Sequence, residues 1–168
     1  RFVHHDSVGL IHDMRRGAPG EPVFAHPQAG CLSAAAWGGF AGPLGLELAD
    51  LEADSLIEQV RSGIETRLSE RLAEAARHDD LVVGKSPVRR SMASEDGELV
   101  LVGSSPVDEL VERARQAGCP VFEPFEDDRL GNTVGADSLS IVGIRPGERA
   151  EAIGRDSEKL ICLEFDET

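Results

Sequence analysis

The chain has 168 residues, of which 40% are hydrophobic, enough for one hydrophobic core or two small ones, and this composition excludes a disordered chain. The formal net charge of −14 at pH 7 repels polyphosphates and anionic lipid headgroups, which excludes non-specific binding to nucleic acids or membranes. Since no apolar run is long enough to span a membrane and none has the features of a signal peptide, we expect a cytoplasmic protein with neither a membrane nor a DNA partner.

The first 46 residues are predicted to form a small αβ domain. Short apolar runs at Phe2–Val3, Val8–Ile11 and Val23–Ala25 are separated by glycine and proline, which is typical of small strands joined by turns. The Ala-rich segment Cys31–Phe40 predicts a short apolar helix. Because the chain opens directly on an apolar run without Met, we expect the natural protein to begin upstream.

A long amphipathic helix, or two shorter ones, is predicted between Leu48 and His78. Apolar residues recur there at a spacing of three to four, with charged residues between them. We assign residues 47–70 to a helical linker. The polar face of the whole Leu48–His78 helix is interpreted as a solvated surface, and the alternative is a contact for a protein partner or for a second copy in a homodimer.

Residues 71–168 are predicted to form a three-layer α/β/α sandwich. Short apolar runs alternate with amphipathic segments, and this order favours helices on both faces of a small sheet. The predicted strands are Leu81–Val83, Glu98–Val102, Pro120–Phe122 and Leu139–Ile144. The predicted helices are Ser86–Ala93, Val107–Ala117 and Glu148–Ile153, with a further edge strand at Leu160–Leu163. The fold class expected for the whole chain is therefore α+β or α/β.

This second part resembles the kink-turn RNA-binding ribosomal-protein family. The resemblance lies in the order of motifs over about half of the chain, since no one of them is specific alone. The motifs are Arg71–Arg77, Leu81–Arg90, Glu98–Val102, Ala117–Phe122, the glycine turn Arg129–Gly135 and the strand Ile141–Ile144.

The resemblance implies two RNA-binding segments. The first is a glycine turn followed by the start of a basic helix: Gly84, Lys85, Ser86, Arg89 and Arg90. The second is a loop where backbone and apolar groups approach flipped-out bases: Arg129, Leu130, Gly131 and Asn132. Carboxylates just before the second segment, from Glu123 to Asp128, oppose phosphate binding. The alternative interpretation is a capped helix with an ordinary solvated basic face.

The N-terminal part resembles the YlxR family, an RNA-associated bacterial domain. The resemblance rests on Arg1–Val3, the turn Asp13–Gly20, an aromatic strand at Phe24 and the small-residue helix from Cys31. The basic residues usual after the turn and in the helix are replaced here by Glu21 and by Ala and Gly. In some bacteria a YlxR-like domain precedes a kink-turn-type domain in one chain, and the order here is the same.

Other polar clusters are weaker candidates for a functional site. His4, His5 and His12 lack a spaced Cys or carboxylate that would complete a metal site. Ser104–Ser105 lies between a predicted strand and a predicted helix, so it is a candidate phosphate-binding loop. However, Ser105 with Asp108 three residues later is typical of a helix N-cap. The cysteines, Cys31, Cys119 and Cys162, are predicted to be reduced and mostly buried.

We therefore expect a protein that is not an enzyme, has no catalytic residues, and needs neither a cofactor nor a metal. The predicted function is association with structured RNA near the ribosome, RNase P or the transcription machinery. The alternative is an acidic derivative of the same fold that serves as a protein-interaction module without RNA binding.

Overall fold

The computed structural model describes residues 25–39, 52–92 and 99–164. The chain divides into two compact units, residues 1–66 with 159–168, and residues 67–158. The first division falls inside helix α3 (Ala53–Arg77), which continues through the end of the predicted linker at residue 70. Each unit is described by itself below.

In the first unit, the predicted apolar helix is present. Helix α1 (Ala29–Ala34) continues into a π-helical turn, η1 (Ala35–Gly39). Leu32 and Ala35 are buried, whereas Trp37 is 87% exposed. The predicted strands before residue 24 lie outside the described residues, and so does the segment from Phe40 to Leu51.

The second unit is built on a four-stranded sheet with strand order β1-β4-β2-β3. The strands are β1 (Leu81–Val83), β2 (Leu99–Val102), β3 (Val121–Phe122) and β4 (Ile141–Ile144). β4 is antiparallel to both of its neighbours, β1 and β2, and β2 is parallel to β3. Every residue of β2 and β4 is buried, as expected for central strands covered on both faces.

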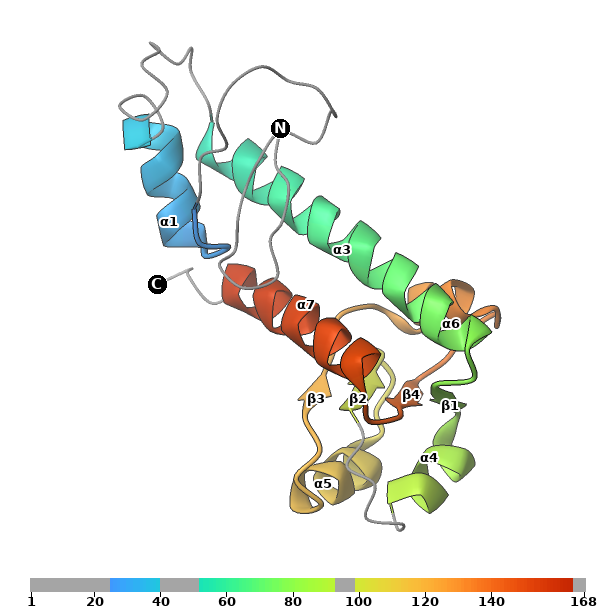
Figure 1. Cartoon of the computed structure of the whole chain (residues 1–168). Helices are drawn as coiled ribbons and strands as arrows, with labels where there is room; N and C mark the ends of the chain where they lie inside the picture. The colour runs from blue at the N-terminus through green and yellow to red at the C-terminus, as the bar shows by residue number, and fades with distance from the viewer. Residues whose placement is uncertain (1–24, 40–51, 93–98, 165–168) are drawn as a thin grey trace. The chain divides into compact units, whose positions relative to one another are not determined.

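One face of the sheet is covered by α4 (Lys85–Ser91) and α5 (Asp108–Gln116) (Figure 1). Apolar side chains from both helices pack against alternate residues of the two central strands, in agreement with the period-two geometry of a strand. The cluster includes Val88, Leu110, Ala114, Val100, Val102 and Ile141.

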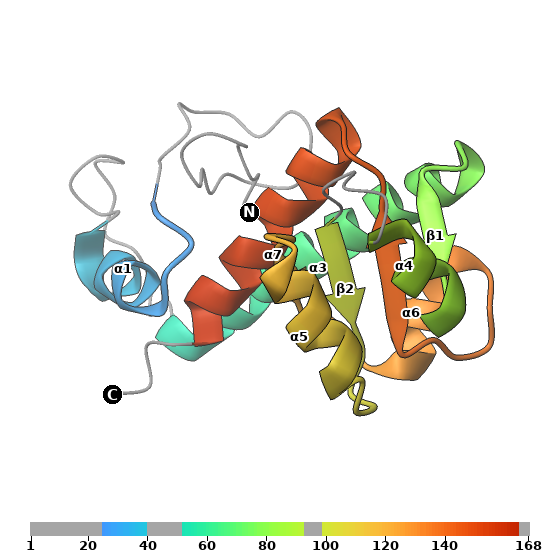
Figure 2. The same ribbon diagram turned by 90° about the horizontal axis from the view of Figure 1, so that it is seen from below.

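The opposite face is covered by α3 from Arg67 onward, by α6 (Asp127–Val134) and by the first part of α7 (Glu148–Glu164) (Figure 2). α7 lies against β2, because a Cβ built on Gly154 would be 3.1 Å from Leu99 Cδ1. The predicted three-layer α/β/α sandwich is confirmed, and the chain has a small α/β fold.

Three local predictions were wrong. The apolar run Leu160–Leu163 is not an edge strand but the end of the continuous helix α7, because Ile153, Leu160 and Leu163 lie on one buried helical stripe. The expected loop at Arg129–Asn132 is part of α6, which ends at Val134 and is followed by Gly135 in the left-handed conformation. Of the three cysteines only Cys119 is buried, and Cys162 is exposed.

Candidate RNA-binding edge

The first predicted RNA-binding segment lies at the end of β1, where Gly84 immediately precedes helix α4. Gly84 has a φ of 92°, which an L side chain rarely adopts. Its N–H donates to the Ile141 carbonyl at 3.3 Å, and its carbonyl accepts from the Val88 N–H at 3.1 Å. The next two residues, Lys85 and Ser86, are exposed. The glycine therefore turns the chain from the sheet into the helix and presents Lys85 at the surface.

The second predicted segment divides into exposed and buried residues, because it is helical. Arg129 and Asn132 are exposed, and the Arg129 guanidinium lies 4.3 Å from the centre of the Phe125 ring. Leu130 and Gly131 are buried, and a Cβ on Gly131 would be 2.6 Å from Ser138 Cα. Leu130 and Gly131 thus lie beneath the predicted surface, not on it.

The fold brings these two segments to the same edge of the sheet. In both views α4 and α6 flank β1 on opposite faces (Figures 1 and 2). The Lys85 ammonium is within electrostatic range of the Asp127 carboxylate at the start of α6. We call the exposed residues at this edge the β1 edge surface: Val83, Lys85, Ser86, Arg129 and Asn132.

The remaining two cations of the first segment, Arg89 and Arg90, have partners in α5 and in α4 itself. Arg89 lies 3.8 Å from the Glu109 carboxylate of α5, and both side chains are at least half exposed. Arg90 Nε donates to the Ser86 carbonyl of its own helix at 3.4 Å. Arg89 is therefore directed toward α5, whereas Lys85 lies near α6.

Asp127 has a role that sequence reasoning missed. The Ser105 N–H donates to Asp127 Oδ1 at 2.9 Å, so the Ser104–Ser105 loop is capped by a carboxylate 22 residues away. Hydrogen bonds from the Ser105 hydroxyl and N–H hold the pKa of Asp127 below its ordinary value of 3.8, with a smaller contribution from Lys85. The carboxylate therefore remains ionised at neutral pH.

The predicted N-cap at Ser105 was wrong. The residue before α5 is Val107, and no side chain caps this helix. Instead, the Ser105 N–H donates to the Asp127 carboxylate, because the turn between β2 and α5 directs this N–H toward α6. No local spacing encodes this contact, although Asp127 lies among the acidic residues noted in the sequence.

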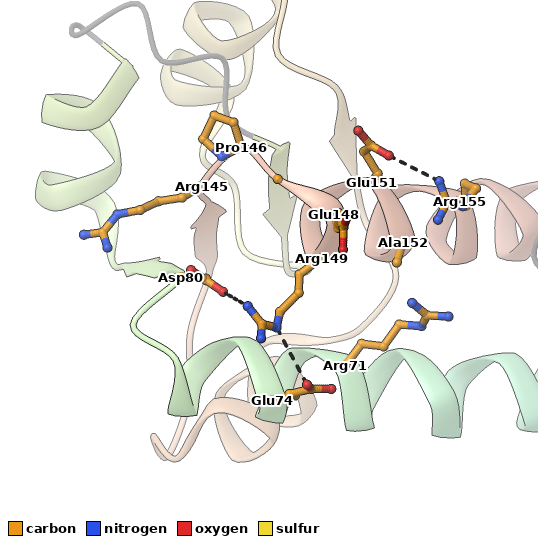
Figure 3. A pocket seen from close by; sticks show the side chains of 11 residues that line it. Arg71, Glu74, Asp80, Arg145, Pro146, Glu148, Arg149, Glu151, Ala152 and Arg155 are labelled. Carbon is orange, nitrogen blue, oxygen red and sulfur yellow. Dashed lines mark hydrogen bonds and ion pairs between the residues drawn. The ribbon is translucent and has the colours of Figure 1, made fainter.

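A cavity of about 770 Å³ lies elsewhere in the second unit, between α3 and the start of α7 (Figure 3). Its charged side chains are largely paired with one another. Arg149 lies 2.7 Å from Asp80 and 3.7 Å from Glu74, and Arg155 lies 3.6 Å from Glu151. Since its lining has four arginines and four carboxylates, it presents little net charge to a ligand.

Within residues 25–39, 52–92 and 99–164, no group of three or more His, Cys, Asp or Glu side chains is arranged to hold a metal ion. The histidines of the N-terminal cluster, His4, His5 and His12, lie outside these ranges. None of the helices in the same ranges is long and apolar enough to cross a membrane.

Comparison with known proteins identifies a fold relative but no family. No protein-family model and no curated protein matches the chain. Among solved structures, a Bacillus halodurans protein of unknown function aligns with a TM-score of 0.52 and 17% sequence identity. The alignment covers 55% of this chain and 97% of that protein. At this identity the likeness shows a shared fold over about half of the chain.

Proposed function

We propose that this chain is a non-enzymatic RNA-associated protein that binds structured RNA at the β1 edge surface. The observation that carries the proposal is that α4, which begins with Lys85, and α6, which carries Arg129, flank the same edge strand, β1, although the two residues are 44 positions apart in the sequence. The resemblance to kink-turn RNA-binding proteins supports it, because both segments that the resemblance assigns to RNA contribute to this edge.

The chemistry of the β1 edge surface suits an unstacked nucleotide in a folded RNA. Val83 is 40% exposed and offers an apolar contact for a base, and Lys85, two residues later, carries an exposed ammonium that suits a phosphate. Arg129 is restrained over the Phe125 ring, so less side-chain freedom is lost when its guanidinium binds. Asn132 adds an amide that donates and accepts hydrogen bonds.

The negative charge around the β1 edge surface limits the affinity for RNA and the range of RNAs that can bind. Glu126 and Asp128 are exposed near the β1 edge surface, and the net charge of the chain is −14. Few cations therefore contact the RNA. Because few phosphates are neutralised, the affinity should depend only weakly on salt concentration. We expect weak binding that depends on the shape of the RNA more than on its total charge.

The test is fluorescence anisotropy with a labelled kink-turn RNA and an unstructured RNA of equal length. Wild type is compared with Lys85→Ala/Arg129→Ala and with a control, Arg113→Ala/Arg115→Ala, which removes two exposed cations from α5. Starting from −14, each double variant has a net charge of −16. We expect the edge variant to bind the folded RNA at least about fivefold more weakly and the control to bind like wild type.

Two results would contradict RNA binding at this surface. One is equal affinity of wild type for the folded and the unstructured RNA. The other is an equal loss of affinity in both double variants, because that would reflect total charge and not position.

A second candidate function, a protein-interaction module, is favoured by the exposed Trp37. This side chain is 87% exposed on η1, and large aromatic residues are enriched at protein interfaces. The apolar stripe of α3 offers no such contact, because it is buried: Leu56, Val60, Ile64, Leu68, Leu72 and Ala75. If Trp37 mediates self-association, light scattering after size exclusion will show a dimer for wild type and a monomer for Trp37→Ala.

A further inference from the structure

Asp127 lies where the loops behind the β1 edge surface meet. Its side chain accepts from the Ser105 N–H at 2.9 Å, and its carbonyl accepts from the Leu139 N–H at 2.9 Å. The Gly103 N–H donates to the Ser140 carbonyl at 3.0 Å. One residue of α6 thus joins the β2–α5 loop to the α6–β4 loop.

The space around the Asp127 carboxylate admits no side chain at position 103. A Cβ built on Gly103 would be 2.2 Å from Asp127 Oδ1 and 3.0 Å from Asp127 Cα. Glycine at this position lets the loop backbone approach the start of α6 closely enough for the Ser105 N–H to reach the carboxylate. The contact is therefore built into the local packing.

We propose that Asp127 is a positioning residue for RNA binding. Its carboxylate fixes the first turn of α6, which carries Arg129, to the β2–α5 loop. This inference rests on the proposed function, because it explains how Arg129 is held at the β1 edge surface.

The proposal predicts that removal of the Asp127 carboxylate weakens RNA binding, whereas charge repulsion alone predicts that it strengthens binding. Removing a carboxylate near bound RNA lowers repulsion between the protein and phosphate, which by itself strengthens binding. Removing the group that positions the first turn of α6 and its Arg129 weakens binding, because a misplaced contact contributes less. Asp128 is a matched control: it is the next residue, has the same side chain and is exposed.

The experiment compares Asp127→Ala, Asp127→Asn and Asp128→Ala by anisotropy with the kink-turn RNA. We expect Asp127→Ala to bind about fivefold more weakly than wild type and Asp128→Ala to bind equally or more tightly. Asp127→Asn keeps an acceptor without the charge, so it should fall between wild type and Asp127→Ala. Binding by Asp127→Ala that equals or exceeds that of Asp128→Ala would overturn the proposal.

Hydrogen exchange of the Ser105 amide, measured without RNA, separates this inference from the proposed function. We expect faster exchange at Ser105 in Asp127→Ala, with unchanged protection in the β2 strand, which also shows that the variant is folded. Unchanged exchange at Ser105 would overturn the positioning role even if wild type binds RNA. Absence of RNA binding by wild type, with faster exchange in the variant, would instead overturn the proposed function.

Discussion

At the scale of single residues, Asp156 is the centre of a buried polar cluster in the second unit. This carboxylate is fully buried and lies between two arginines of α3. Arg67 Nε donates to Oδ2 at 2.9 Å, and Arg71 Nε lies 3.0 Å from the same oxygen. A buried carboxylate is tolerated only with such partners, because its loss of hydration must be offset by charge and hydrogen bonds.

Replacement of Asp156 by Ala should lower the free energy of unfolding by about 3 kcal/mol, since it leaves two partly buried guanidinium groups without their shared carboxylate. The measurement is urea unfolding followed by circular dichroism. Glu158→Ala, which removes an exposed carboxylate from the same helix, is the control and should change stability little. Equal stabilities of the two variants would contradict the account of this cluster.

The pH dependence of stability should reveal the Asp127 contact. Because folding lowers the pKa of this carboxyl, the folded state favours its ionised form. Its contribution is fully present above its ordinary value of 3.8 and is lost as the pH falls through the lower folded-state pKa. The stability difference between wild type and Asp127→Asn should thus be constant near pH 7 and shrink below about pH 4. A stability difference that grows as the pH falls would contradict a lowered pKa of Asp127 in the folded state.

At the scale of secondary structure, periodic elements could be predicted and contacts between loops could not. The apolar residues from Leu56 to Ala75 predict helix α3, and the apolar run of β2 predicts a buried strand. In both elements the spacing of apolar residues in the sequence matches the residues that are buried. The end of α7 was misjudged because Leu160–Leu163 is short and apolar, a pattern that strand and helix share. The Asp127–Ser105 contact was missed because it depends on where two loops meet, which no spacing encodes.

Helix α6 depends on close packing at Gly131, a residue that the sequence suggested for RNA contact. Replacement by Ala would place a Cβ 2.6 Å from Ser138 Cα and 2.7 Å from Ser138 N, where backbone must shift. We expect a loss of about 2 kcal/mol in thermal or urea unfolding. Asn132→Ala, on the exposed side of the same helix, should leave stability within about 0.5 kcal/mol of wild type. If Gly131→Ala is as stable as Asn132→Ala, the packing of α6 differs from that described.

At the scale of the whole molecule, the excess of acidic residues should make stability depend on salt. The chain has 31 Asp and Glu against 17 Lys and Arg, and self-repulsion of such a surface disfavours the compact state. Raising NaCl from about 10 mM to about 300 mM screens this repulsion. We expect stability to rise by about 1 kcal/mol, or roughly 2–4 °C in Tm. A lower Tm at high salt would mean that surface ion pairs outweigh the repulsion.

The measurement that tests the central claim most directly is amide chemical-shift mapping of the ¹⁵N-labelled protein titrated with a kink-turn RNA. The account predicts saturable shifts concentrated at Val83–Ser86 and Arg129–Asn132, with smaller changes at the adjoining Gly103–Ser105 loop and none along α5. Shifts centred on α5, or no shifts at low salt, would contradict RNA binding at the β1 edge surface.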